Sequence, residues 1–268
     1  NFTAIIGESG CGKSVLGQAI LNILPSGVIK KGRVLYNGEQ VEKILSAFGI
    51  IPQNPSESLN PVRKIGKQMQ DILAVHNIVD SDNSYKKQCL RLFGLEEAER
   101  VLAAYPHELS GGMLQRVLCA MAVSSKPEWI LADEPTKGLD EQVGAIVRKN
   151  LLTIKQDLHL SMLIITHDIA LAQEVCDDVL VMYAGQVLEH NADIWHKPLH
   201  PYTKGFLKAL PKNGLQVIPG KAPVPGESFT GCKFAARCPY CTTRCKEEKP
   251  AMQQVGNAEV RCFLYAEG

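Results

Sequence analysis

Short apolar runs alternate with stretches of helical apolar spacing along most of the chain. The runs predict buried strands at 2–6, 33–36, 47–51, 129–133, 161–166 and 178–183. Helical spacing begins at 13–24, directly after the first of these strands. Because strands and helices alternate, the pattern predicts an α/β fold with a largely parallel sheet.

The pattern changes twice along the chain. Segments 62–77, 84–95 and 110–123 all have helical spacing, which indicates a helical insertion. After residue 190 proline and glycine become frequent, so we expect an irregular linker over 210–231 and a small tail behind it. The expected division is a core of 1–53 and 125–190, a helical subdomain of 54–124 and an extension of 191–268.

Composition and charge argue against a nucleic-acid-binding protein and a membrane-spanning protein. With 45% hydrophobic and 21% charged residues the chain is an ordinary globular protein. A net charge of +1 gives no basic footprint for nucleic acid. No apolar run approaches the roughly 18 residues of a membrane span. The chain starts at Asn1, almost inside a predicted strand, so we expect a further segment before it.

The sequence GESGCGKS at 7–14 has the spacing of a phosphate-binding loop. Gly7 and Gly12 allow backbone N–H groups to curl around a phosphate, Lys13 reaches the terminal phosphates, and Ser14 reaches Mg²⁺. The strand before the loop and the helix after it place the loop at a helix N-terminus. This context argues against a glycine turn that matches by chance.

The sequence WILADEP at 129–135 is an apolar strand that ends in two acids. An aspartate at the end of a strand beside a phosphate loop holds Mg²⁺ in phosphate-loop enzymes, which indicates this role for Asp133. The next carboxylate, Glu134, is placed to polarise a water for attack on the γ-phosphate. Taken alone, the motif is equally consistent with surface acids at a strand-to-turn junction.

The sequence LSGGMLQR at 109–116 is a second helix start that suits an anion. Exposed N–H groups and the positive end of the helix dipole favour a phosphate there. The simpler interpretation is an N-cap at Ser110. One domain does not need two such sites, so we expect the second to serve a nucleotide held by another subunit.

At this point the chain resembles an ATP-binding-cassette (ABC) ATPase over its whole length. The phosphate loop, LSGGM, ILADEP, GLD at 138–140, Gln53 in IPQNP and His167 in IITHD stand in the family's order. The resemblance implies an ABC-type P-loop ATPase core of α/β class with a helical insertion and a small Cys-rich C-terminal extension. It also implies that ATP and Mg²⁺ are the cofactors.

The family implies a role for each matching position. Glu134 would be the general base, and His167 would contact and sense the γ-phosphate; a strand-end histidine with one local hydrogen bond is the alternative. Ser14, Gln53 and Asp133 would attend Mg²⁺, and Asp140 would lie at the dimer seam. The nucleotide-contacting set expected from loop and signature is Gly7, Glu8, Ser9, Gly10, Cys11, Gly12, Lys13, Ser14, Ser110, Gly111 and Gly112.

Two features depart from the usual family pattern. The aromatic residue that stacks on adenine has no counterpart, because the chain starts after its usual place. Cys11 occupies a loop position that usually holds a small residue such as serine, and we expect it to react with oxidants or alkylating reagents if it is exposed.

The C-terminal part points to one branch of the family. HKPLHPYTKGFLKALP at 196–211 and the segment at 218–241 are similar to the extension of peptide and nickel importer ATPases, where HPYT precedes a helix. The text around LSGGM and the short segment before Gln53 favour the nickel-importer subunit. Dipeptide and oligopeptide ATPases, which are very similar there, are the alternative.

Five of the nine cysteines lie in the last 37 residues. Four thiolates can hold zinc or an iron–sulfur cluster. We favour a structural metal centre, because so short a tail has little core of its own. The resemblance of the tail to some peptide importers implies a 4Fe–4S cluster ahead of zinc. Free thiols and a disulfide are the alternatives. The expected ligands are Cys232, Cys238, Cys245 and Cys262, and Cys241 is the extra cysteine.

The resemblance implies a peripheral ATPase subunit at the cytoplasmic face of the membrane. It would pair with a second, paralogous ATPase subunit and drive two membrane permease subunits that receive cargo from an extracytoplasmic binding protein. A soluble ABC ATPase of DNA maintenance or translation is the different-class alternative, but the coiled-coil insertion or second cassette of those proteins is lacking. A metal-sensing module that only binds ATP is disfavoured by Glu134.

Overall fold

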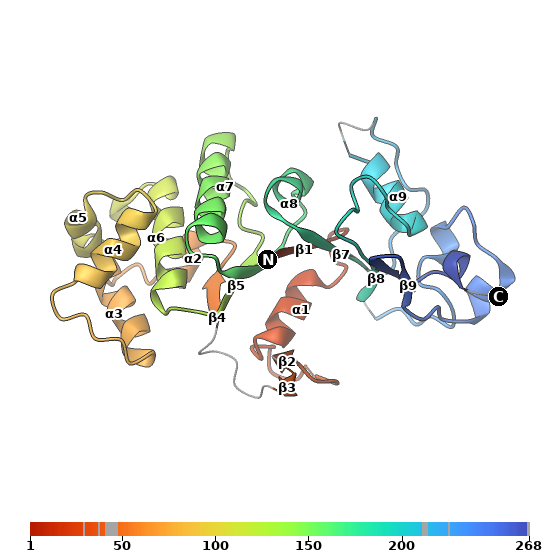
Figure 1. The fold of residues 1–268 in the computed structure, drawn as a ribbon, viewed down its shortest axis with the longest axis horizontal. Coiled ribbons are helices and arrows are strands. Elements are labelled where there is room, and N and C mark those ends of the chain that lie inside the picture. Colours follow the sequence, from red (N-terminus) through yellow and green to blue (C-terminus); the bar gives the residue numbers. More distant parts are fainter. Residues whose placement is uncertain (29, 37, 41–47, 211–213, 225, 267–268) are drawn as a thin grey trace.

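The fold is of the α/β class. Its central sheet is mixed, with a group of helices at one end and the C-terminal extension at the other (Figure 1). The computed structural model describes all residues except 29, 37, 41–47, 211–213, 225 and 267–268. The main sheet has eight strands, in spatial order β4 (Phe48–Ile51), β5 (Trp129–Asp133), β6 (Ser161–Ile165), β1 (Phe2–Ile6), β7 (Asp178–Tyr183), β8 (Gln186–His190), β10 (Ala258–Val260) and β9 (Gln253–Val255).

The strands from β4 to β7 are parallel, as the apolar runs predict. Phe2, Ala4, Ile5 and Ile6 of β1 are at most 1% exposed, because helices cover both faces of this part of the sheet. Figure 1 places α7 (Glu141–Gln156) and α8 (Ile169–Val175) on one face and α1 (Lys13–Ile20) on the other. The predicted strand 33–36 is the short β2 (Leu35–Tyr36), which pairs with β3 (Glu39–Gln40) outside the main sheet.

The remaining strands add an antiparallel part to the main sheet, which is therefore mixed. β7 pairs with β8, β8 with β10, and β10 with β9, all antiparallel. Two of these strands come from the cysteine-rich part of the chain. The end of the extension therefore continues the main sheet and is not a separate tail behind a linker.

The helical insertion packs beside the sheet and shares one apolar core with it. It contains α2 (Pro55–Ser58), α3 (Ile65–Val75), α4 (Ser84–Leu92), α5 (Ala98–Ala103) and α6 (Gly111–Ser124), with a 3₁₀ turn over Pro106–Glu108 before α6. Ten residues of α6 are buried, because this helix packs between the other helices and β4. The insertion thus joins the edge of the sheet through one central helix.

A buried carboxylate organises the start of the extension. Glu189 in β8 is 0% exposed, and it accepts hydrogen bonds from the backbone N–H groups of Leu199 and His200, both at 2.8 Å. His200 then caps α9 (Pro201–Lys208), accepting from the N–H of Tyr202. HPYT therefore contains the helix start, whereas the sequence analysis placed the helix after it.

An aromatic cluster binds the extension to the core. Tyr183 of β7, Tyr202 of α9 and Phe234 are at most 1% exposed, with ring centroids 4.6–5.4 Å apart. Phe234 lies just before the 3₁₀ turn Ala235–Arg237, after which come α10 (Thr243–Glu247) and a last 3₁₀ turn over Phe263–Tyr265. These rings tie the extension to the strand beside the phosphate loop.

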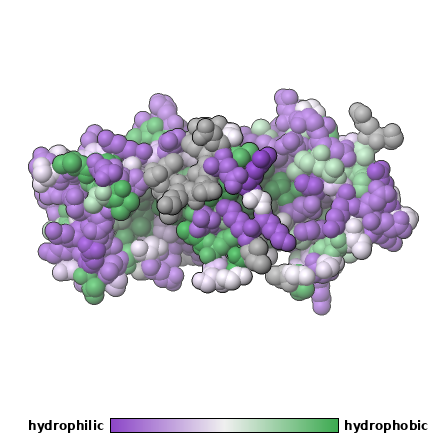
Figure 2. Space-filling model, turned by 90° about the horizontal axis from the view of Figure 1, so that it is seen from below, coloured by the Kyte–Doolittle hydropathy of each residue, from purple (hydrophilic) through white to green (hydrophobic). Residues whose placement is uncertain are grey.

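The described part of the chain contains no helix that is long and apolar enough to cross a membrane. On the face shown in Figure 2, hydrophilic residues cover most of the surface, including much of its two ends.

Candidate functional site

The phosphate loop joins the end of β1 to the start of α1. Gly7 has a φ of 152°, and a Cβ there would lie 2.2 Å from the carbonyl oxygen of Met182, so no side chain fits. Gly12 caps α1 with a φ of 99°, in the left-handed region that favours glycine. Both glycines of the motif are therefore required by the backbone, which turns sharply and lies against β7.

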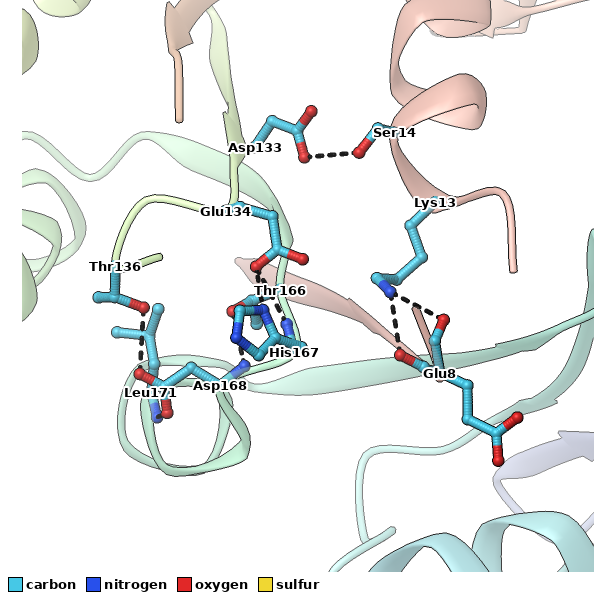
Figure 3. Close-up of polar contacts among 11 residues, drawn as sticks. Glu8, Lys13, Ser14, Asp133, Glu134, Thr136, Thr166, His167, Asp168 and Leu171 are labelled. Carbon is cyan, nitrogen blue, oxygen red and sulfur yellow. Dashed lines mark hydrogen bonds and ion pairs between the residues drawn. The ribbon is translucent and has the colours of Figure 1, made fainter. Parts of the chain in front are cut away.

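Lys13 turns back into its own loop. Its side chain is buried, and Nζ donates to the carbonyl oxygens of Gly7 at 2.9 Å and Glu8 at 3.3 Å (Figure 3). An ammonium held among loop carbonyls at a helix N-terminus is suited to accept a polyphosphate in the same place.

Ser14 and Asp133 meet across two elements. The Ser14 hydroxyl, in the first turn of α1, donates to Oδ1 of Asp133 at 3.1 Å (Figure 3). Burial raises the pKa of Asp133, although the bond from Ser14 opposes the shift. Hydroxyl and carboxylate oxygens are ligands that Mg²⁺ prefers, so this pair fits the ion that the motif implies.

Glu134 and His167 form the second polar pair of the site. Glu134 is buried, and its Oε2 lies 2.5 Å from Nδ1 of His167 and accepts from the His167 backbone N–H at 3.3 Å. Glu134 also has a φ of 49°, which is uncommon for a residue with a side chain. Strain of this kind persists where the surroundings fix it, and here the Glu134 N–H donates to Ile165 at 2.7 Å.

Parallel pairing explains why these residues meet. Asp133 is in register with Ile165, and Ile51 with Ala132, so β4, β5 and β6 end at one edge of the sheet. Gln53 follows β4 by two residues and is exposed at that edge. The carboxyl ends of adjacent parallel strands thus carry the expected magnesium and water-activating groups together.

Three further residues support this edge, and the sequence did not indicate the contacts among them. The Thr136 hydroxyl donates to Oδ2 of Asp168 at 3.1 Å, and the Asp168 N–H donates to the Thr166 hydroxyl at 2.9 Å (Figure 3). Asp168 also caps α8 by accepting from Leu171. An aspartate before a helical run is an N-cap signal, but its bond to Thr136 is not visible in the sequence.

Ser110, Gly111 and Gly112 lie elsewhere. Ser110 caps α6, accepting from Met113 at 3.3 Å, and Figure 1 shows α6 among the helices at one end, away from α1. Asp140 likewise caps α7, accepting from Val143 at 2.9 Å. Both have the local capping role that a single chain requires, and Ser110 and Asp140 are exposed.

Comparison with known proteins identifies the family. A model of the ABC transporter family matches residues 1–137, more than half of the chain, and one of the C-terminal region of oligopeptide/dipeptide transporters matches residues 188–245. The chain is 36% identical over 274 residues to the dipeptide transport ATP-binding protein DppD of Escherichia coli (strain K12), covering 94% of this chain and 83% of the relative. The chain belongs to the ATP-binding subunits of oligopeptide/dipeptide ABC transporters.

Other relatives agree with this placement of the ATPase. It is 36% identical over 288 residues to the oligopeptide transport ATP-binding protein AppD of Bacillus subtilis (strain 168), covering 98% of this chain and 87% of the relative. Among solved structures, cbiO1 of Clostridium perfringens, part of the ABC transporter complex cbiONQ, has a TM-score of 0.61 at 28% identity, covering 72% of this chain and 77% of that one. The predicted fold class and ATP-hydrolysing activity are thereby confirmed.

The prediction of a nickel-importer subunit is not supported. The relatives described above are named for dipeptides and oligopeptides, so the comparisons favour the alternative. Part of the segment before Gln53 that suggested nickel, residues 41–47, lies outside the described residues.

Cys11 was expected to react with oxidants or alkylating reagents only if it is exposed. It is 5% exposed, so this condition is not met. Burial raises the pKa of its thiol, so the neutral form is favoured. Cys11 therefore serves as a small apolar residue inside the phosphate loop of the ATPase.

The expected ligands of the metal centre in the extension do not converge on one point. Within the described residues, no group of three or more His, Cys, Asp or Glu side chains stands in a position to hold a metal ion. All nine cysteines are free thiols. The four expected ligands nevertheless line one cavity of about 180 Å³: Cys232, Cys238, Cys245 and Cys262.

Proposed function

We propose that this ATPase powers the import of short peptides. The observation that carries the proposal is the match of residues 188–245 to the C-terminal region of oligopeptide/dipeptide transporters, in a chain that also holds the ATP site. In this proposal the chain sits at the cytoplasmic face of the membrane. It pairs with a second ATPase subunit, a paralogue, and acts on two permease subunits supplied with cargo by a binding protein.

Each site residue has a proposed task. Lys13 and the amides of residues 7–14 bind the phosphates. Ser14, Gln53 and Asp133 would hold Mg²⁺, which would neutralise phosphate charge when bound. Glu134 accepts the proton of the attacking water, and His167, bonded to Glu134 at 2.5 Å, orients that carboxylate and contacts the γ-phosphate.

A complete reaction site would need the facing subunit. Ser110, Gly111 and Gly112 open α6 with free N–H groups, far from the phosphate loop of their own chain, so we assign them to the ATP of the second subunit. Asp140 would lie at the same seam. Two subunits that share two ATPs in this way convert binding and hydrolysis into closing and opening of the pair.

The cargo is tested by ATP turnover in the reconstituted complex. The ATPase, its paralogue, the permease subunits and the binding protein are placed in lipid vesicles. We expect a binding protein loaded with di- or oligopeptides to raise ATP turnover several-fold, and one loaded with Ni²⁺ to leave it unchanged. The reverse response would reinstate nickel import, and a response to neither would refute both.

We also propose that the cysteine cavity holds an iron–sulfur cluster, with zinc as the alternative. Support comes from the four cysteines, which line one cavity of about 180 Å³. Thiolate sulfur is a preferred ligand of zinc and of iron–sulfur clusters, so the donor type suits such a centre, and the four side chains would have to move together to hold it. The centre would brace the extension.

Metal analysis tests this centre. Protein purified without oxygen should contain stoichiometric iron and sulfide, or else zinc. Cys232→Ser should lose the metal and expose residues 230–268 to protease, whereas Cys241→Ser, outside the ligand set, should retain it. Metal-free protein with an equally protected extension would contradict the proposal.

A further inference from the structure

Arg237 of the extension forms an ion pair with Glu8 of the phosphate loop. Nη1 of Arg237 donates to Oε2 of Glu8 at 3.0 Å, and Nη2 donates to Oε1 at 3.2 Å. The side chains are 7% and 25% exposed, so this two-pronged ion pair is largely shielded from water. Paired hydrogen bonds between a guanidinium and a carboxylate fix both distance and orientation.

Arg237 is itself held by the rest of the extension. Its Nε donates to the carbonyl oxygen of Pro219 at 3.0 Å, and Nη2 contacts that of Ile218 at 3.4 Å. Nη1 also donates to the hydroxyl of Tyr183 on β7 at 3.3 Å. These contacts fix the position of the guanidinium to which Glu8 is hydrogen-bonded.

Glu8 is fixed from three directions. Its N–H donates to the hydroxyl of fully buried Tyr202 at 3.1 Å, and its carbonyl accepts from Lys13 at 3.3 Å. Arg237 takes the third group, the carboxylate. Figure 3 shows this carboxylate turned away from Lys13, Ser14 and Asp133, so the loop's own negative charge is aimed out of the site where ATP phosphates bind.

We propose that Arg237 is a positioning residue for ATP binding: it neutralises Glu8 and keeps its carboxylate away from the phosphates. The inference rests on the ATP site assigned above. Without Arg237, the carboxylate of Glu8 would be unpaired. It belongs to the loop whose backbone amides bind the negatively charged phosphates. Repulsion over such distances weakens anion binding in a partly buried site.

The expected effect falls on binding and spares the chemical step. Arg237→Gln should raise the Kd and KM for ATP about tenfold, as expected for one uncompensated charge near the phosphates. The kcat at saturating ATP should stay within about twofold, because Glu134 and His167 are untouched. Arg237→Lys keeps the positive charge but loses the paired hydrogen bonds, so its Kd for ATP should lie between those of the wild type and Arg237→Gln.

A rescue experiment separates this role from general loosening of the extension. Titrations of the full chain with ATP would compare Arg237→Gln, Glu8→Gln and the double variant. If Arg237 acts through the charge of Glu8, the double variant should return to within about threefold of wild type. Arg244→Gln is the matched control, since Arg244 pairs with Glu248 on the surface of the same extension.

Two results would overturn the proposal. One is an unchanged Kd in Arg237→Gln; the other is a double variant that binds ATP as weakly as Arg237→Gln, which would assign the loss to the fold of the extension. Should Arg237→Gln fail to fold, the Arg237→Lys series with and without Glu8→Gln decides the question in the same way. Wild-type ATP affinity and peptide-stimulated turnover are measured separately, so failure here leaves the cargo proposal standing.

Discussion

Glu134→Gln should reduce steady-state ATP turnover by about 10²-fold or more while ATP binding persists. Glutamine has the same shape and can accept a hydrogen bond, but it cannot take the proton of the attacking water. The substitution should affect hydrolysis and spare ATP binding, because Glu134 is buried and its Oε2 lies 2.5 Å from His167. Turnover and Kd for ATP are measured on the same preparation.

Glu141→Gln is the matched control for that experiment. Glu141 is an exposed carboxylate in the first turn of α7, seven positions along the chain from the proposed base. It should keep turnover near that of wild type. A Glu134→Gln enzyme within about twofold of wild type would remove Glu134 from the mechanism.

Lys13→Ala should weaken ATP binding itself. A charge-assisted contact with phosphate contributes roughly 1.5–3 kcal/mol, which corresponds to a Kd raised by about ten- to a hundredfold. Lys13 is 6% exposed and its ammonium bonds two loop carbonyls, so no other cation takes its place without rearrangement of the loop. The Kd is measured by titration with ATP and Mg²⁺.

Lys197→Ala controls for the loss of a positive charge at the surface. Its side chain is 81% exposed and pairs with Asp193 in the extension. The nucleotide affinity of this variant should match wild type. Equal affinities in Lys13→Ala and wild type would show that the loop does not bind phosphate through Lys13.

The parallel strands were predictable because each is a continuous apolar run buried on both faces. Expected strands at 2–6, 129–133 and 178–183 coincide with β1, β5 and β7. Strands β8, β9 and β10 were not predicted, because they are three to five residues long and carry polar residues, including the buried Glu189. Such short strands form only where a neighbouring edge accepts their hydrogen bonds.

The ATP-site chemistry was also largely readable. Glycine spacing in the loop reflects local backbone requirements, seen in the left-handed φ of Gly12 and the contact of Gly7 with β7. Acids at a strand end are brought to the loop by parallel pairing, which a strand–helix alternation already implies. The meeting of Ser14 with Asp133 follows from these two facts.

By itself the sequence determined the phosphate loop, the parallel core and the helical insertion, because each depends on residues near one another in the chain. Only the tertiary structure decided that the extension reaches back to the ATP site. Glu8 and Arg237 are 229 residues apart, and neither belongs to a pattern that requires the other. Their pairing depends on Tyr183, Tyr202 and Phe234 packing the extension onto β7, which burial of the three rings in one cluster makes favourable.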